Sequence, residues 1–232
     1  MSEKPESTPL IRLTGVSKLF DDGLIRALDG VTMAVERGEF VAITGPSGCG
    51  KSTLLHLIAA LDVPTSGTIA VNGHDLRFTG SDVFRRTEVG LVFQLHNLLP
   101  HLSALENVEV AMFSNGMRHK QQRERARDLL RAVGLAAKES APPPRLAGGE
   151  RQRLAIARAL ANSPSIILAD EPTGNLDSDS AERVLALFRH IREERGVTIM
   201  LVTHDPQVAA AADRMILMRD GRVIEGEGNS TR

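Results

Sequence analysis

A glycine-rich stretch near residue 50 has the residue types and spacing that bind a phosphate chain. Residues 45–52 fit the pattern G-x-x-x-x-G-K-[ST], in which backbone N–H groups wrap the phosphates. In this pattern Lys51 reaches the outer phosphates, and the hydroxyl of Ser52 ligates Mg²⁺. Apolar runs at 40–43 and 54–58 flank the stretch, which predicts a strand, a loop and a helix. The predicted phosphate-binding residues of the loop are Gly45, Pro46, Ser47, Gly48, Cys49, Gly50, Lys51, Ser52 and Thr53.

Two carboxylates at the end of another apolar run could hold the metal and activate water. Asp170 and Glu171 directly follow 165–169, which has the composition of a buried strand. The C-terminal tips of such strands are where α/β sheets place their ligands. Asp170 suits Mg²⁺ coordination, and Glu171 suits orienting or deprotonating a water. A lone Asp-Glu pair would be interpreted as a surface turn, but a magnesium-dependent phosphate loop needs an acidic partner.

Two further polar side chains follow predicted strands. Gln94 comes after the apolar run 89–93, and His204 comes shortly after 197–202. A histidine there can hydrogen-bond a terminal phosphate and the attacking water, because it is neutral or charged near pH 7. Gln94 also begins a loop-like segment that carries several apolar side chains, which suggests a docking surface. Packing of these side chains on the following helices is the alternative.

A second glycine-rich stretch precedes a helical region. The glycine pair 148–149 lies just before a helix expected at 151–161, and glycines at a helix start leave free N–H groups for an anion. Residues 103–135 also have a helical pattern. Residues 141–144, Ala-Pro-Pro-Pro, predict a stiff extended linker. We therefore expect 95–145 to form a helical insert that is hinged on both sides.

The remaining sequence predicts a small antiparallel layer ahead of the phosphate loop. Runs at 10–20 and 27–35 are expected to be strands joined by a turn. Phe20 ends the first run and is a candidate shelf for a purine base; a core or edge phenylalanine is the alternative. We also expect strands at 68–71, 215–218 and 222–224, helices at 178–195 and 209–212, and a loose tail from Gly226.

The composition favours a soluble protein with a substantial core. The chain has 232 residues, of which 42% are apolar, enough for one large domain or two lobes. Its 28 basic and 29 acidic residues nearly balance, so charge gives no argument for nucleic acid as a partner. The single cysteine fits a reducing compartment. No stretch approaches the roughly 18 apolar residues of a membrane span, and the first eight residues lack a signal core.

Together these motifs resemble those of the ATP-binding cassette ATPases. The phosphate loop, Gln94, 146–150, 166–171, 175–177 and His204 occur in the order and approximate spacing of that family, and the likeness covers nearly the whole chain. It implies an α/β fold: a P-loop, RecA-like core with an N-terminal antiparallel β layer and a helical subdomain.

The resemblance also implies one cassette over residues 1–232. Its core and β layer would take 1–94 and 162–232, and the helical signature subdomain would take 95–161.

The resemblance further implies roles for individual residues, in a head-to-tail dimer that encloses ATP. Phe20 would stack on the base. The catalytic side chains would be Glu171, His204, Lys51 and Gln94. The Mg²⁺ ligands would be Ser52, Gln94 and Asp170. The residues that act on the ATP of the other copy would be Ala147, Gly148, Gly149, Glu150 and Asp177.

Within the family, the likeness is greatest to ATPases of lipoprotein-release, macrolide-efflux and cell-division systems. The stretches 93–100, 104–108, 148–153 and 169–177 carry it. Such a subunit would hydrolyse ATP at the cytoplasmic face of the inner membrane, as the peripheral partner of a separate integral membrane permease. The alternative is a regulatory ATPase of a cell-division-type complex, which transmits its nucleotide state without moving a solute. A cassette acting on ribosomes or DNA fits poorly, because this chain has neither paired cassettes nor a long coiled-coil insert.

One departure from the family pattern predicts a measurable effect. Ala147 stands where the signature usually has serine, so the hydroxyl that would meet the γ-phosphate on the other copy is missing. A charged hydrogen bond is worth about 1.5–3 kcal/mol at most. We therefore expect Ala147→Ser to raise the steady-state rate of ATP turnover. Turnover that stays the same or falls would refute this assignment.

Overall fold

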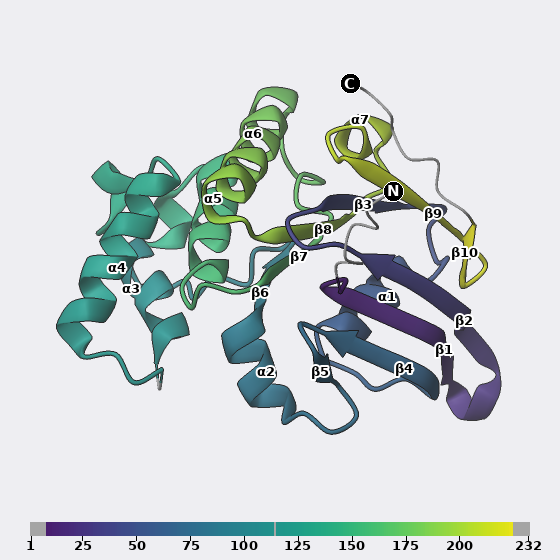
Figure 1. The fold of residues 1–232 in the computed structure, drawn as a ribbon. Coiled ribbons are helices and arrows are strands. Elements are labelled where there is room, and N and C mark those ends of the chain that lie inside the picture. Colours follow the sequence, from purple (N-terminus) through teal and green to yellow (C-terminus); the bar gives the residue numbers. More distant parts are fainter. Residues whose placement is uncertain (1–7, 114, 225–232) are drawn as a thin grey trace, which may run out of the picture.

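The computed structural model describes residues 8–113 and 115–224; the tail from Gly226 lies outside them. Among the described residues, six strands form a sheet in the order β10-β9-β3-β8-β7-β6 (Figure 1). All adjacent pairs are parallel except β10 with β9, which forms the predicted closing hairpin. The strands are β3 (Phe40–Thr44), β6 (Val89–Phe93), β7 (Ile166–Asp170), β8 (Thr198–Val202), β9 (Arg214–Arg219) and β10 (Arg222–Ile224).

A second, antiparallel sheet packs beside the first and confirms the predicted β layer (Figure 1). Its strand order is β2-β1-β4-β5, and Ile11 of β1 pairs with Val35 of β2 and with Val71 of β4. The short 3₁₀ turn 21–23 joins β1 to β2. The strands are β1 (Ile11–Phe20), β2 (Ile25–Val35), β4 (Ser66–Val71) and β5 (His74–Asp75).

The strands of the parallel sheet supply side chains to two separate cores. Val41 and Ile43 of β3 face helix α1 (Lys51–Ile58) and the antiparallel sheet. Phe40 and Ala42 face the opposite side, where the remaining large helices pack. Successive side chains of a strand point to opposite faces, and both faces are covered, so the strands are apolar throughout.

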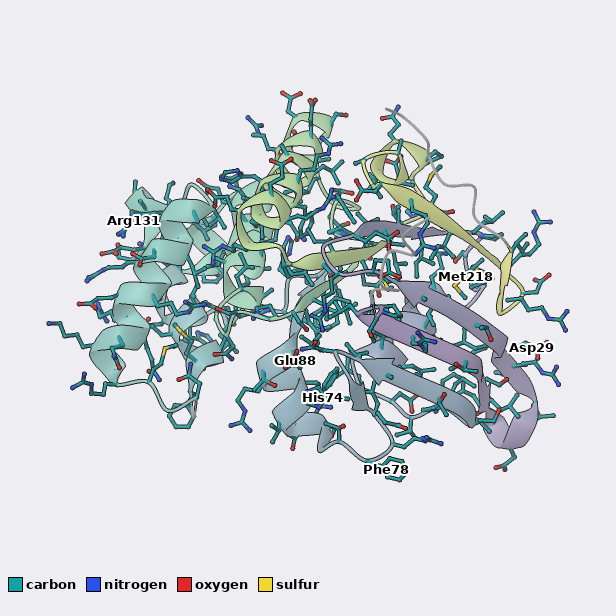
Figure 2. All side chains as sticks on the ribbon, viewed as in Figure 1. Asp29, His74, Phe78, Glu88, Arg131 and Met218 are labelled. Carbon is teal, nitrogen blue, oxygen red and sulfur yellow. The ribbon has the colours of Figure 1, made fainter. Side chains whose placement is uncertain are left out.

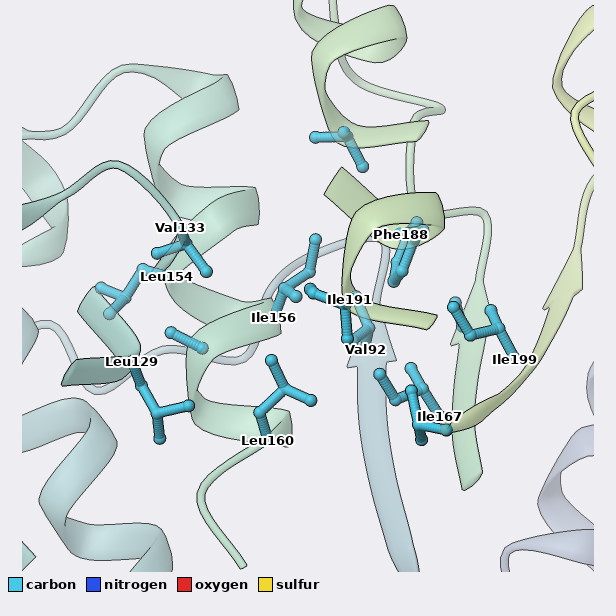
Figure 3. Close-up of a cluster of buried hydrophobic side chains, with 14 of the residues drawn as sticks. Val92, Leu129, Val133, Leu154, Ile156, Leu160, Ile167, Phe188, Ile191 and Ile199 are labelled. Carbon is cyan, nitrogen blue, oxygen red and sulfur yellow. The ribbon is translucent and has the colours of Figure 1, made fainter. Parts of the chain in front are cut away.

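Helices α3 (Ala104–Glu109), α4 (His119–Ala132), α5 (Gly148–Ala159) and α6 (Ser178–Arg195) lie on that opposite side (Figure 1). One continuous hydrophobic cluster joins them to the sheet: Leu129 and Leu154 pack at one end, Ile156 and Phe188 lie between, and Ile199 of β8 lies at the other end (Figure 3). The helical segment therefore shares a core with the parallel sheet. The division at residues 95 and 161 stays a prediction.

Local capping signals fix where these helices begin and end. The Ser103 side chain accepts a hydrogen bond from the Glu106 N–H, and the Glu106 carboxylate accepts one from the Ser103 N–H, which forms a capping box at α3. The Asp177 side chain caps α6 by accepting a hydrogen bond from the Ser180 N–H, and Gly196 ends α6 with a positive φ of 63°. The predicted bounds of α6 are confirmed.

Three local expectations were wrong. Of the prolines expected to form an extended linker, Pro142 is extended, but the next two lie in a 3₁₀ turn at Pro143–Arg145, because proline suits the first positions of a helical turn as well as an extended chain. The signature helix begins at Gly148, earlier than the expected 151. The last helix is α7 (Pro206–Ala209) rather than 209–212, because Asp205 caps it and Pro206 follows directly.

Helix α2 (Ser81–Glu88) was not predicted from the sequence. Its last residue, Glu88, joins three elements: Glu88 Oε2 accepts hydrogen bonds from Asn72 Nδ2 and Ser165 Oγ, each at 2.7 Å. His74 of β5 lies beside Glu88, with 4.0 Å between Nε2 and Oε1 (Figure 2). These contacts fasten the edge of the antiparallel sheet to the parallel sheet. Within the described residues, no helix has both the length and the apolar character needed to cross a membrane.

The close approach of β6 to α5 predicts a large effect from a small substitution. A Cβ atom on Gly90 would lie 2.6 Å from the carbonyl oxygen of Ala159, whereas one on Gly80 would meet nothing within 4 Å. We expect Gly90→Ala to lower the free energy of unfolding by about 1–3 kcal/mol, because the backbone must move. Gly80→Ala is the control and should change it by less than about 1 kcal/mol. Equal melting temperatures for the two variants in a thermal scan would rule out this packing.

Candidate functional site

The carboxyl ends of four neighbouring parallel strands bring the predicted side chains together. The phosphate loop follows β3, Gln94 follows β6, Asp170 ends β7 with Glu171 after it, and His204 lies two residues beyond β8. Because β3, β8, β7 and β6 are adjacent and parallel, these ends lie along one edge of the sheet. This is the edge at which open α/β sheets bind ligands.

The phosphate loop packs tightly against the antiparallel layer. Gly50 has a φ of 102°, and a Cβ atom there would clash with the carbonyl oxygen of Ala27 in β2, so this position requires glycine. The Gly221 N–H donates to the Cys49 carbonyl at 3.1 Å, which fixes the loop to the closing hairpin as well. Pro46, Ser47 and Gly48, at the tip of the loop, are exposed to solvent.

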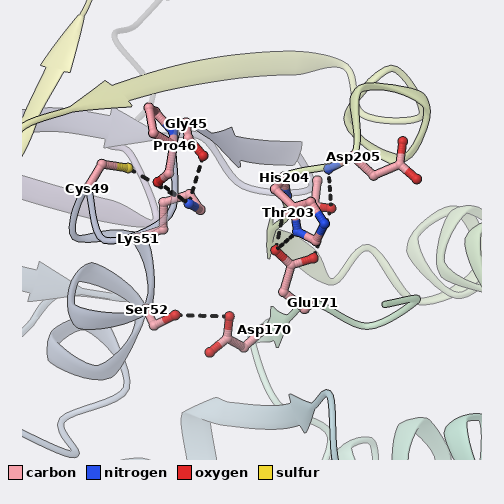
Figure 4. A network of polar contacts seen from close by, with 10 residues as sticks. All are labelled: Gly45, Pro46, Cys49, Lys51, Ser52, Asp170, Glu171, Thr203, His204 and Asp205. Carbon is pink, nitrogen blue, oxygen red and sulfur yellow. Dashed lines mark hydrogen bonds and ion pairs between the residues drawn. The ribbon is translucent and has the colours of Figure 1, made fainter. Parts of the chain in front are cut away.

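Lys51 lies within its own loop. Its Nζ donates to the carbonyl oxygens of Gly45 and Pro46, each at 2.8 Å, and lies 3.8 Å from the buried Cys49 Sγ (Figure 4). Only 8% of Lys51 is exposed. A buried ammonium needs acceptors, and the loop carbonyls provide them. The same ammonium is placed to exchange these oxygens for those of a phosphate chain.

Asp170 faces the first turn of α1. Ser52 Oγ donates to Asp170 Oδ1 at 3.2 Å, which joins the phosphate-loop helix to β7 (Figure 4). Burial raises the pKa of the Asp170 carboxyl, and the hydrogen bond from Ser52 opposes this shift. A hydroxyl and a carboxylate this close form the oxygen-only donor set that Mg²⁺ prefers.

Glu171 is held by the segment that follows β8. Glu171 Oε1 lies 2.6 Å from His204 Nδ1 and accepts a hydrogen bond from the His204 N–H at 3.0 Å (Figure 4). Glu171 Oε2 accepts one from Thr203 Oγ1 at 3.1 Å. The Glu171 backbone has a φ of 46°, an uncommon value for a residue with a side chain. The structure thus joins two residues that the sequence analysis placed on separate strand ends.

Gln94 lies at the same edge but has a different neighbour. The Gln94 Nε2 would be 3.0 Å from a Cβ on Gly174, and Asn175 Nδ2 donates to the backbone carbonyl oxygen of Gln94 at 3.5 Å. Within the described residues, no hydrogen bond joins the Gln94 side chain to Ser52 or Asp170. Of the three predicted metal ligands, Ser52 and Asp170 are therefore the pair that the described structure joins by a hydrogen bond.

The signature residues lie at the start of α5, away from the phosphate loop. Ala147 is exposed at the N-cap, and its N–H donates to Glu150 Oε2 at 2.9 Å. A Cβ atom on Gly149 would lie 3.1 Å from Ser180 Oγ, so α5 and α6 are in close contact there. Helices α5 and α1 pack on opposite faces of the parallel sheet. Within one copy of the chain, the two glycine-rich stretches therefore lie apart, because their helices are on opposite faces of the sheet.

Two side chains of this region were missed by the sequence analysis. Thr203 Oγ1 donates to Glu171 and accepts from the Asp205 N–H at 3.1 Å; its place at a strand end was the available signal. Arg158 of α5 donates to the backbone carbonyls of His96, at 2.7 Å, and Asn97, and so holds the segment after Gln94. No local sequence pattern indicates these contacts of Arg158.

The raised pKa of Asp170 predicts a pH-dependent gain from removing its charge. A carboxyl with a raised pKa in the folded state lowers stability once the pH exceeds its unfolded-state pKa of about 3.9. We expect Asp170→Asn to raise the melting temperature of the nucleotide-free protein near about pH 8, and the gain to shrink towards about pH 4. Asp220→Asn, in an exposed turn with a φ of 50°, is the control and should give no such gain. A lower melting temperature for Asp170→Asn at high pH would refute the prediction.

Comparisons with known proteins agree with this geometry. The family model described as ABC transporter matches residues 28–174. The lipoprotein-releasing system ATP-binding protein LolD of Bordetella avium is 47% identical over 221 residues, which cover 93% of this chain and 96% of that protein. The macrolide export ATP-binding/permease protein MacB of Salmonella choleraesuis is 44% identical over 222 residues, which cover 94% of this chain but 34% of MacB.

A solved structure with the same fold is the dimeric, post-hydrolysis state of the ATP-binding cassette MJ0796 bound to ADP and Pi. Its TM-score is 0.86 at 41% identity, and the match covers 96% of this chain and 100% of MJ0796. The predicted P-loop α/β fold and the predicted likeness to lipoprotein-release and macrolide-efflux ATPases are confirmed. The chain belongs to the ABC transporter family, as one of its ATPase subunits.

Proposed function

We propose that this chain binds and hydrolyses ATP, dimerises on ATP, and drives a separate membrane permease of the efflux or lipoprotein-release type. The observation that carries the proposal is the shared strand edge, where the phosphate loop, the acidic pair and His204 meet. The relatives support it, since LolD is named as the ATP-binding protein of a lipoprotein-releasing system and MacB as a macrolide exporter.

The residues present fit Mg²⁺ together with a nucleotide. Ser52 and Asp170 would hold the ion, with Gln94 as the third predicted ligand. Within the described residues, no group of three or more His, Cys, Asp or Glu side chains could hold a metal by itself, so phosphate oxygens and water would complete the coordination. Bound Mg²⁺ would neutralise charge on the β- and γ-phosphates. Phe20 would carry the base.

Glu171 would accept the proton of the attacking water. Its Oε2 accepts a hydrogen bond from Thr203 and its Oε1 contacts His204, and because a carboxylate oxygen can accept more than one hydrogen bond, Oε2 could also accept one from that water. His204 would leave Glu171 for the terminal phosphate when ATP binds, and its 70% exposed side chain has room to turn. Lys51 would likewise leave its loop carbonyls for phosphate oxygens.

A second copy would complete each site. The signature residues face away from their own phosphate loop, so a head-to-tail pair would bring the N–H groups of Gly148 and Gly149 to the γ-phosphate on the other copy. Ala147, Glu150 and Asp177 would flank that contact. The dimeric state of the MJ0796 cassettes supports this arrangement.

The permease would dock beside the segment that follows Gln94, at the cytoplasmic face of the inner membrane. Leu98 packs against the large core, as the alternative for this segment expected, whereas Leu95 is 77% exposed and Leu99 is 43% exposed and would carry the docking surface. A cavity of about 340 Å³ adjoins the segment, between α2, β6 and Arg158. Exposed apolar side chains next to such a cavity suit a protein partner.

The second candidate is a regulatory ATPase of a cell-division-type complex. The missing signature hydroxyl at Ala147 favours it, because a weaker hold on the γ-phosphate would slow turnover while nucleotide-dependent closure remained. The two candidates differ in the membrane partner. Purification of the intact complex and identification of its membrane subunit would separate them.

Removal of the proposed base should trap the closed dimer. Glu171→Gln keeps the shape of the side chain and one acceptor oxygen, but it replaces the other oxygen with an amide donor and removes the ability to take a proton. With Mg-ATP, we expect this variant to migrate as a dimer in size-exclusion chromatography and the wild type to return to a monomer as ATP is consumed. Glu193→Gln, an exposed carboxylate near the C-terminal end of α6, is the control and should behave as the wild type. A Glu171→Gln protein that stays monomeric with ATP would count against the ATP-enclosing dimer.

A further inference from the structure

Lys18 makes contacts that the proposed mechanism does not use. Its Nζ lies 2.6 Å from Asp62 Oδ1 and donates to the Val63 carbonyl oxygen at 2.9 Å, both in the loop after α1. The same Nζ lies 4.9 Å from the centre of the Phe20 ring. Lys18 is only 9% exposed, whereas Phe20 is 39% exposed. A buried ammonium therefore lies between a carboxylate and an aromatic ring that is partly open to solvent.

The strand geometry places this group next to the phosphate loop. Lys18 and Phe20 are two residues apart on β1, beside a register shift in its pairing with β2, and the contact between the Lys18 ammonium and the Phe20 ring places the two side chains together. Lys18 pairs with Leu28 of β2, and the neighbouring residue Ala27 has its carbonyl oxygen against Gly50. A nucleotide whose phosphates occupy the loop can thus reach the Phe20 ring with its base.

We propose that Lys18, anchored by Asp62, is a positioning residue that presents the free face of the Phe20 ring to the base of ATP. The inference rests on the proposed function, in which Phe20 carries the base. An ammonium over one face of an aromatic ring is attracted to it, most strongly where water is excluded. A ring already held in place loses less conformational freedom when a base stacks on its other face.

A purely structural role makes a different prediction. In that case the Lys18–Asp62 pair only fastens the loop after α1 to β1, a task that Thr65 shares by donating its N–H to the Ser17 carbonyl oxygen at 2.9 Å. Loss of the pair would then weaken folding, or would weaken every ligand of the phosphate loop equally. Loss of a base-positioning residue would weaken only ligands that have a base.

The test compares ATP with inorganic tripolyphosphate, which has the phosphates but no base. Binding of each to the full chain with Mg²⁺ is measured by isothermal titration calorimetry. We expect Lys18→Met to weaken ATP about fivefold and to leave tripolyphosphate unchanged. Lys18→Arg should restore ATP binding, because a guanidinium also stacks on aromatic rings. Arg12→Met, which removes a positive charge from an exposed position of the same strand, is the control and should change neither ligand.

Each other outcome overturns a defined part of the account. Unchanged ATP binding in Lys18→Met, or equal losses for both ligands, overturns the positioning role of Lys18. Phe20→Ala tests the base shelf: if it leaves the ratio of ATP to tripolyphosphate affinity unchanged, the shelf and this inference both fall. If Lys18→Met does not fold, Asp62→Asn decides, because it keeps the ammonium and loosens its anchor. If Asp62→Asn weakens ATP binding by a smaller factor and leaves tripolyphosphate binding unchanged, the proposal is supported. If Asp62→Asn causes no loss that is confined to ATP, the proposal is overturned.

Discussion

In-register pairing of four parallel strands is the constraint on which the candidate site depends. Phe93 pairs with Asp170, Asp170 pairs with Val202, and Val202 pairs with Ile43. The residues after these positions therefore leave the sheet at the same level, and they include most of the proposed functional side chains. A slip of one residue would turn every side chain of a strand to the other face. The alternation that fills two cores thus also aligns the proposed metal ligands, the proposed catalytic base Glu171 and the phosphate loop.

Charged groups of the site are hydrogen-bonded within their own chain. Lys51 is bonded to carbonyls of its loop, and Glu171 is bonded to Thr203 and His204. A buried charge without a partner would cost several kcal/mol, so these contacts stabilise the site. In the proposed mechanism, ATP binding exchanges some of them. The net affinity then reflects the difference between the old and new contacts, and dimer closure can be coupled to that exchange.

The sequence predicted most of what lies at the strand ends, because glycines and carboxylates there have local signals. The phosphate loop, the acidic pair and the bounds of α6 needed no tertiary information. Contacts across the fold had no such signal: Arg158 holds a carbonyl 62 residues away, and Thr203 holds Glu171 across neighbouring strands. Helix α2 was missed because it is short and has only two apolar residues, Val83 and Phe84, of which Phe84 alone is buried. The proline segment was wrong because the fixed φ of proline suits both an extended chain and a 3₁₀ turn.

The central claim is that one copy of this chain holds only part of each ATP site and that a second copy supplies the rest. The most direct measurement is the rate of ATP hydrolysis per mole of chain, at saturating Mg-ATP, over a wide range of protein concentration. If two copies complete the site, this specific rate rises with concentration and levels off once the dimer predominates. A specific rate that stays constant down to concentrations at which light scattering detects only monomer would contradict the account.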